Sequence, residues 1–157
     1  MKFYLILAFC LMACGHITSP DDFRLESTFT LTDTVGQSTT LIHSGENFYL
    51  SFLLTNTTND TLTYYSGSSA PPVLFRILRG DNIIASSIDG YAFLQYISTG
   101  ILAPGQKIDT NWKAPTTPAQ YHKVILKPGR YQAVALSPNF NEAKTKKASP
   151  IYFDVID

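Results

Sequence analysis

Apolar and polar residues alternate one by one along several short stretches of this chain, and this alternation constrains its fold most strongly. Between positions 48 and 55, the large apolar side chains Phe48, Leu50, Phe52 and Leu54 occupy every second position. Such side chains share one face of a β-strand, because successive residues of a strand point to opposite faces. No stretch keeps a helical period for three turns. The pattern therefore predicts an all-β protein.

The same pattern, in weaker form, predicts the other strands. They are expected at residues 23–31, 39–43, 62–65, 73–78, 83–86, 108–112, 131–136 and 151–155. Residues 79–82 (Arg-Gly-Asp-Asn) read as a hairpin turn, and residues 89–97 fit either a helical turn or an extended segment. Short strands separated by Gly, Pro and Asn, at spacings of roughly 8–12 residues, predict a two-sheet antiparallel β-sandwich. Tyr131, two residues after Gly129, is placed to act as a tyrosine corner.

The first residues of the chain have the order of an export signal. Lys2 precedes an apolar run that ends at Met12, which is too short for a transmembrane helix of roughly 17–25 residues. The sequence Leu-Met-Ala-Cys that ends at Cys14 resembles a bacterial lipobox, in which the cysteine receives a diacylglycerol before the leader is removed. We therefore expect a signal peptide at 1–13, a lipidated tether at 14–22 and a folded domain at 23–157. An ordinary secretory leader is the alternative.

Acylation of Cys14 makes a lipid bilayer the first expected partner and the cell envelope the expected location. The anchor would lie in the outer membrane of a Gram-negative cell, or otherwise on the outer face of the plasma membrane. Cys10 leaves with the leader, so the mature chain has one cysteine and forms no internal disulfide. Basic and acidic residues number 12 each, so the chain lacks the positive charge that nucleic-acid binding requires.

Several motifs between residues 47 and 136 resemble a known family as a group. They are Leu53 to Asp60, Phe75, Gly80-Asp81-Asn82, Phe93, Leu102-Ala103-Pro104-Gly105, Trp112, and Leu126 to Tyr131. This pattern is similar to the BsuPI family, named for an intracellular proteinase inhibitor of Bacillus. The resemblance implies an immunoglobulin-like antiparallel β-sandwich and, as its most specific consequence, proteinase inhibition. Family members typically carry a Trp-Ser pair where this chain has Ser86-Ser87-Ile88.

The first candidate binding site is the polar loop Asn56, Thr57, Thr58 and Asn59, which joins two expected core strands. It resembles the Asn-Pro-Thr-Thr-Gly loop of the chagasin-type cysteine-protease inhibitors, without the Pro and the Gly. A rigid sandwich that holds a loop in shape lowers the cost of ordering it on binding. The alternative is a turn chosen for the hydrogen bonds that Asn and Asp side chains make to the backbone.

The second candidate site is a group of tyrosines, Tyr65, Tyr91 and Tyr96, in segments that also contain Tyr64 and Phe93. Exposed rings favour contact with protein or sugar, because they provide contact area at little entropic cost. The alternative is that half of these rings point into the core, which the alternation supports for Phe93.

No constellation of residues indicates catalysis. His16, His43 and His122 are scattered, and neither a zinc-ligand spacing nor a Ser-His-Asp arrangement surrounds them. We expect no enzyme activity, no catalytic residue, no metal site and no cofactor. The expected function is non-catalytic binding through loops, with proteinase inhibition as its specific form and a protease as the partner. The alternative is a structural or accessory module that docks on another envelope protein.

Overall fold

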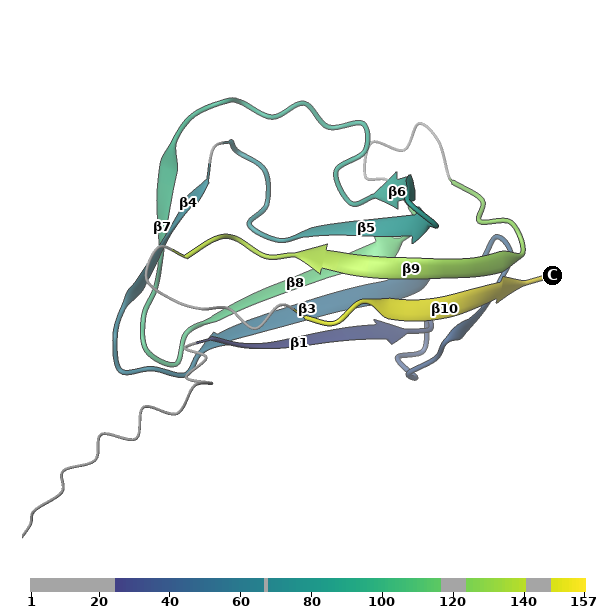
Figure 1. The fold of residues 1–157 in the computed structure, drawn as a ribbon, viewed down its shortest axis with the longest axis horizontal. Coiled ribbons are helices and arrows are strands. Elements are labelled where there is room, and N and C mark those ends of the chain that lie inside the picture. Colours follow the sequence, from purple (N-terminus) through teal and green to yellow (C-terminus); the bar gives the residue numbers. More distant parts are fainter. Residues whose placement is uncertain (1–24, 67, 117–123, 141–147) are drawn as a thin grey trace, which may run out of the picture.

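The structure, a computed structural model, describes residues 25–66, 68–116, 124–140 and 148–157, and over these residues the chain is all β, with no helix (Figure 1). The strands are β1 (Leu25–Thr32), β2 (Leu41–His43), β3 (Phe48–Asn56), β4 (Leu62–Ser66), β5 (Leu74–Arg79), β6 (Asn82–Ser86), β7 (Ser98–Leu102), β8 (Lys107–Ala114), β9 (Gly129–Leu136) and β10 (Ile151–Ile156). The predicted fold class, all-β, is confirmed.

Two larger sheets and one small ribbon contain these strands. β1, β3 and β8 form an antiparallel sheet in that order. The second sheet has the order β2-β10-β9-β5-β6 and is antiparallel except for the parallel pair of β2 and β10. β4 and β7 pair only with each other as strands, and we call them the β4–β7 ribbon. Among the described strands, β8 is therefore an edge of the first sheet and β6 an edge of the second.

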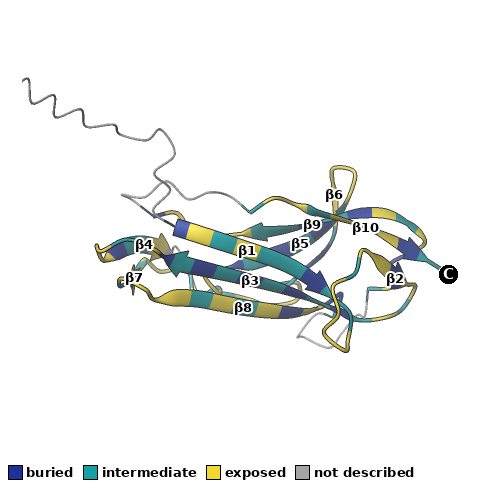
Figure 2. Cartoon of the chain, turned by 90° about the horizontal axis from the view of Figure 1, so that it is seen from below, coloured by how far each residue is buried: buried dark blue, intermediate teal, exposed yellow. Residues whose placement is uncertain are grey.

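The period-two pattern of β3 is observed as predicted. Phe48, Leu50, Phe52 and Leu54 are buried, as is Asn56 at the end of the strand, and the residues between them are partly exposed. Figure 2 shows this striping along β3, in the centre of its sheet. The buried face of β3 points toward the five-stranded sheet and supplies one wall of the core.

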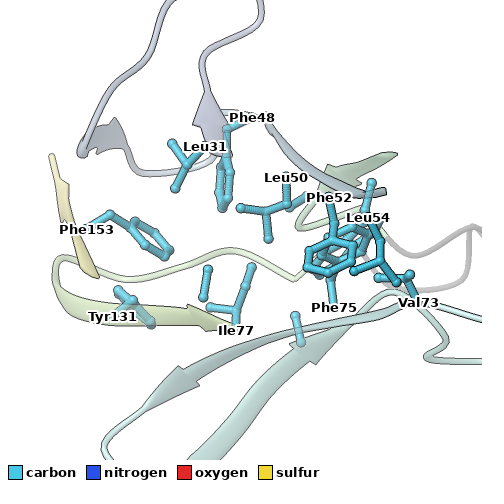
Figure 3. Packing of buried hydrophobic residues seen from close by; sticks show 14 of the residues in the cluster. Leu31, Phe48, Leu50, Phe52, Leu54, Val73, Phe75, Ile77, Tyr131 and Phe153 are labelled. Carbon is cyan, nitrogen blue, oxygen red and sulfur yellow. The ribbon is translucent and has the colours of Figure 1, made fainter. Parts of the chain in front are cut away.

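Aromatic rings from the two larger sheets meet in a single hydrophobic core (Figure 3). The ring of Phe48 lies 5.3 Å from that of Phe153. Phe75 stacks on Phe29 at 6.0 Å and on Trp112 at 6.3 Å, so this one ring of β5 contacts both β1 and β8. Trp112 is 5% exposed and therefore belongs to this core.

Tyr131 makes the hydrogen bond that was expected of it. Its hydroxyl donates to the carbonyl oxygen of Lys127, four residues earlier, at 2.7 Å. Its ring is buried and stacks on Phe153 at 5.7 Å. The chain that enters β9 is thereby fixed to the core at the start of the strand.

The region that precedes β8 differs from the prediction. Residues 87–90 form a short turn, and residues 91–97 follow in irregular conformation. They lead into β7, a strand that the alternation did not indicate. β7 contains Ser98, Thr99 and Gly100, which give it little apolar period. A Cβ atom at position 100 would overlap the ring of Tyr64, its partner across the ribbon, so any larger residue there would force that ring to move.

The expected signal peptide at 1–13, Cys14 and the tether lie outside the described residues. The folded domain was expected from Phe23, and its first described strand begins at Leu25. In the part of the chain that the structure describes, no helix has the length and apolar character needed to cross a membrane.

Candidate binding site

The side chain of Asn56 is fully buried and holds the polar loop that follows β3. Its Nδ2 donates to the carbonyl oxygens of Asp60 at 2.7 Å and Leu102 at 2.9 Å. Its Oδ1 accepts from the backbone N–H of Thr58 at 3.0 Å and from the Thr58 hydroxyl at 2.7 Å. These are the hydrogen bonds of a turn built around an Asn side chain. A partner cannot reach Asn56, so its part in any binding is to hold the loop in shape.

The tip of the same loop is accessible. Thr57 and Asn59 are exposed, and Thr58 is half-buried. The backbone of Asn56 also joins this loop to the turn before β8, because its N–H donates to Gln106 at 3.0 Å and its carbonyl accepts from Gly105 at 2.9 Å. Thr57 and Asn59 are therefore the residues of the loop whose side chains a partner could contact.

The three tyrosines of the second candidate site lie outside the core. Tyr65, Tyr91 and Tyr96 are each about half exposed. Phe93 is partly buried, and its ring centroid lies 5.8 Å from that of Tyr91. Tyr64 is partly buried and packs on Phe140 at 5.2 Å. The alternation along β4 thus separates an inward Tyr64 from an outward Tyr65.

An apolar crevice of about 370 Å³ opens between β5 and β8, beneath the segment that carries Tyr91. Val73 and Phe75 line it from β5 and its approach, Trp112 lines it from β8, and Tyr91 and Phe93 close it from above. The closing segment follows β6, and β6 and β8 are edges of the two larger sheets. The volume and the aromatic walls are those of a site for a small apolar group.

Two serine hydroxyls line this crevice and supply polar contacts. The Ser69 hydroxyl accepts from the backbone N–H of Leu94, and the Ser87 hydroxyl accepts from that of Phe75, both at 3.0 Å. Each bond uses a lone pair, so each hydroxyl keeps its own hydrogen for donation. The crevice therefore combines apolar walls with hydroxyl groups that could donate to a carbonyl oxygen.

Ser69 also joins the two loops that carry the tyrosines. Its N–H donates to the carbonyl of Leu94 at 3.0 Å, which completes a pair of hydrogen bonds between these two residues. A second hollow, of about 210 Å³, lies on the other side of this pair of hydrogen bonds. Tyr64, Tyr96 and Gly100 are among the residues that line it. Tyr91 and Tyr96 thus belong to neighbouring hollows that share Ser69.

The structure does not bring the two predicted sites together. The loop that begins at Asn56 leads into the first residue of β4, whereas Tyr65 lies next to the last residue of that strand. At about 3.3 Å per residue, β4 separates them by roughly 10–13 Å. Tyr91 and Tyr96 lie beyond the far end of β4, so the tyrosines and the polar loop are separate surfaces.

Sequence reasoning did not identify the crevice residues Ser87 and Trp112 as site residues, nor the exposed aliphatic side chains beside the tyrosines. Leu94, Ile97 and Ile101 are 74%, 84% and 67% exposed. One signal was present: segments 61–75 and 90–106 contain no Asp, Glu, Lys, Arg or His. Exposed apolar side chains that gather on one surface of such segments indicate a place of contact with a partner or a membrane.

No group of three or more His, Cys, Asp or Glu side chains that could hold a metal ion occurs within the described ranges. His43, at the end of β2, has its Nδ1 3.0 Å from the carbonyl oxygen of Asp157. The chemistry that the described site offers is therefore contact with apolar groups and hydrogen bonding to neutral ones.

Neither a protein-family model nor a curated protein matches the sequence. Among solved structures, the chain is similar to part of an alkylpurine DNA glycosylase from Pseudomonas fluorescens bound to DNA containing an abasic site analog, with 15% identity and a TM-score of 0.44 over 85% of this chain and 30% of that chain. A β-glucosidase from Listeria innocua in complex with glucose has 10% identity and a TM-score of 0.43 over 85% of this chain and 16% of that chain. A β-glucosidase from Erythrobacter marinus has 11% identity and a TM-score of 0.41 over the same shares. The chain thus spans less than a third of the length of each of these three proteins, and these similarities carry no argument about its activity.

Proposed function

We propose that this protein is a lipoprotein, anchored through Cys14, whose immunoglobulin-like antiparallel β-sandwich is a non-catalytic binding domain. Two observations support the sandwich: the aromatic contacts of Phe75 with both Phe29 and Trp112 across the core, and the hydrogen bond of Tyr131 to Lys127. The second is the bond of a tyrosine corner. The lipobox at Cys14 supports the anchor.

The crevice is the observation that carries the binding function. β8 is an edge strand and contributes Thr110, Asn111 and Trp112 to the crevice lining. An extended peptide can add to such an edge through main-chain hydrogen bonds, and it then places alternate side chains into adjoining pockets. We propose that a partner lies along β8 and inserts an uncharged apolar side chain beneath Tyr91, where the Ser69 and Ser87 hydroxyls are in reach of its backbone.

Proteinase inhibition is the specific form of this proposal, and the resemblance to the BsuPI family supports it. A protease would then be the partner that supplies the apolar segment. Thr57 and Asn59, at the tip of the preformed loop, are the second set of residues that could enter an active-site cleft. A rigid loop of this kind binds with little ordering cost.

The second candidate function is an accessory module that docks on another envelope protein. The outer edge of β8, which no other described strand pairs with, favours it, because an edge strand can pair with any extended segment and not only with that of a protease. In this case the contact surface is the same, whereas no protease is inhibited.

The full chain, extracted from membranes in detergent, tests these proposals when it is titrated into a panel of serine and cysteine proteases. Stoichiometric inhibition supports the inhibitor. Full protease activity, together with one defined envelope protein that is retained by the immobilised chain and identified by mass spectrometry, supports the accessory module.

A single substitution tests whether the crevice is the contact surface in either case. Tyr91→Ala should weaken binding about tenfold, because truncation of a central aromatic contact residue costs more than about 1 kcal/mol. The matched control is Tyr152→Ala on β10, since Tyr152 is also about half exposed but does not line the crevice. Equal affinity of the two variants would contradict the crevice as the binding site.

A further inference from the structure

The outward face of the β4–β7 ribbon is apolar and uncharged. Tyr65 and Ile101 lie on this face and are 53% and 67% exposed, and Ile97, directly before β7, is 84% exposed. Positions 97, 99 and 101 share one side of the strand because side chains alternate. Thr63, the partner of Ile101, and Thr99, the partner of Tyr65, complete the face. We call these five residues the ribbon face.

Charged side chains are absent from the sequence around the ribbon face. They make up 15% of the whole chain, yet segments 61–75 and 90–106 contain none. The nearest charges along the chain are Asp60 and Asp89 on the acidic side and Arg76 and Lys107 on the basic side. These cancel, so the ribbon neither attracts nor repels a charged surface strongly.

The ribbon lies at the end of the domain from which the N-terminal segment leaves. Leu25, the first described residue, pairs with Asn56, and the loop from Asn56 leads into β4. Figures 1 and 2 show the start of β1 at the same end of the molecule as β4 and β7. Residues 15–24 join Cys14 to this point and, fully extended, span at most about 33–36 Å.

We infer that the ribbon face rests in the interfacial region of a lipid bilayer, an inference that depends on the proposed acylation of Cys14. A short tether that ends beside β4 keeps this end of the domain at the membrane. Tyrosine rings and aliphatic side chains suit the boundary between headgroups and acyl chains, and no charge has to be desolvated there. The exposed apolar residues are otherwise a liability for a domain in water.

With the ribbon face in the bilayer interface, the orientation of the whole domain relative to the membrane is fixed. Thr57 and Asn59 lie in the loop before β4 and so face the headgroups. The crevice under Tyr91 lies along the side of the domain, where a partner can still approach. Of the polar loop and the crevice, the crevice is thus the surface that remains open on the membrane.

Site-specific fluorescence tests this orientation with the full chain, processed in cells and reconstituted in vesicles of phosphatidylethanolamine and phosphatidylglycerol. An environment-sensitive dye is attached at Thr99→Cys on the ribbon face or, as a control, at Asn82→Cys, an exposed position at the start of β6 and at the far end of the domain. We expect the dye at position 99 to shift to the blue, to be quenched by spin-labelled lipid and to resist aqueous iodide. The dye at position 82 should do the reverse.

Substitutions on the ribbon face provide the second measurement. Ile97→Glu with Ile101→Glu, in the Thr99→Cys chain, should abolish the blue shift and restore quenching by iodide. Both side chains are exposed, so the fold should persist, and the emission of the single tryptophan, Trp112, monitors it. Ile83→Glu is the matched control, since Ile83 is an exposed isoleucine on β6.

The outcomes separate the orientation from the anchor. An anchored chain, labelled by palmitate at Cys14, whose position 99 remains open to iodide would overturn the inference and leave the lipoprotein proposal intact. Protection of position 99 that appears only when membrane proteins are added would replace the bilayer with a protein partner and would also overturn it. A chain without palmitate at Cys14 would overturn the anchor and the orientation together.

Discussion

Asn56 is a polar residue at the end of a strand whose inward face is otherwise apolar. The alternation from Phe48 to Leu54 continues through position 56, so the sequence period itself places this side chain inside. The turn-forming hydrogen bonds to Thr58 and Asp60 could be predicted, because they are local. The bond to the carbonyl of Leu102 could not, because this partner is 46 positions away and comes from β7.

We predict that Asn56→Ala lowers the free energy of unfolding by about 2–4 kcal/mol, because it leaves buried carbonyl and N–H groups without partners. Urea titration followed through Trp112 emission measures this loss. Asn59→Ala, in the same loop but exposed, should change the free energy by less than about 0.5 kcal/mol. Similar losses in the two variants would mean that the loop is held by its backbone alone.

Among the elements, the contrast between β3 and β7 explains how far the sequence predicts the fold. The sequence predicts β3 clearly, because every second residue from Phe48 to Leu54 is large and apolar. β7 has serine and glycine at two of its three inward positions, and the ring of Tyr64 lies over Gly100 and takes the place of a side chain. A strand whose inward face is filled by its partner leaves no period of its own in the sequence.

The crevice was not predictable for a related reason. Trp112, Phe75 and Val73 carry the pattern of core residues, and they are buried. The same side chains line the crevice only because residues of β5, of β8 and of the segment with Tyr91 surround one common space. Periodicity reports which face a residue takes, and it does not report the distance between two sheets.

At the scale of β8, we predict that Trp112→Ala lowers the free energy of unfolding by roughly 3–5 kcal/mol through the cavity it creates. The loss includes the stacking on Phe75 and the hydrogen bond from Nε1 to the carbonyl of Thr116 at 2.8 Å. Thermal unfolding followed by circular dichroism measures it. Trp112→Phe keeps the ring contact and should cost less, and a melting temperature unchanged in both variants would contradict the packing.

The molecule as a whole has two ends that differ in chemistry. At one end the chain enters β1 beside an uncharged ribbon that bears exposed tyrosine and isoleucine. At the other lie the turns at Gly45, at Gly80-Asp81 and at Lys127-Pro128, where exposed charged residues are frequent. The two larger sheets share one hydrophobic core, so the two ends belong to the same folded body. Whatever holds the first end therefore determines which sides of the domain a partner can reach.

The anchor on which this orientation depends is tested by the two cysteines near the N-terminus. We predict that Cys14→Ala leaves an unprocessed precursor that takes up no radiolabelled palmitate, because the alanine offers no thiol for the diacylglycerol that precedes cleavage. Cys10→Ala is the matched control, since Cys10 lies in the apolar part of the proposed leader and should be lost with it. This variant should be processed and labelled as the wild type is. Equal labelling of the Cys14 variant and the wild type would exclude the lipobox, and the ribbon face would then need an occupant other than the bilayer.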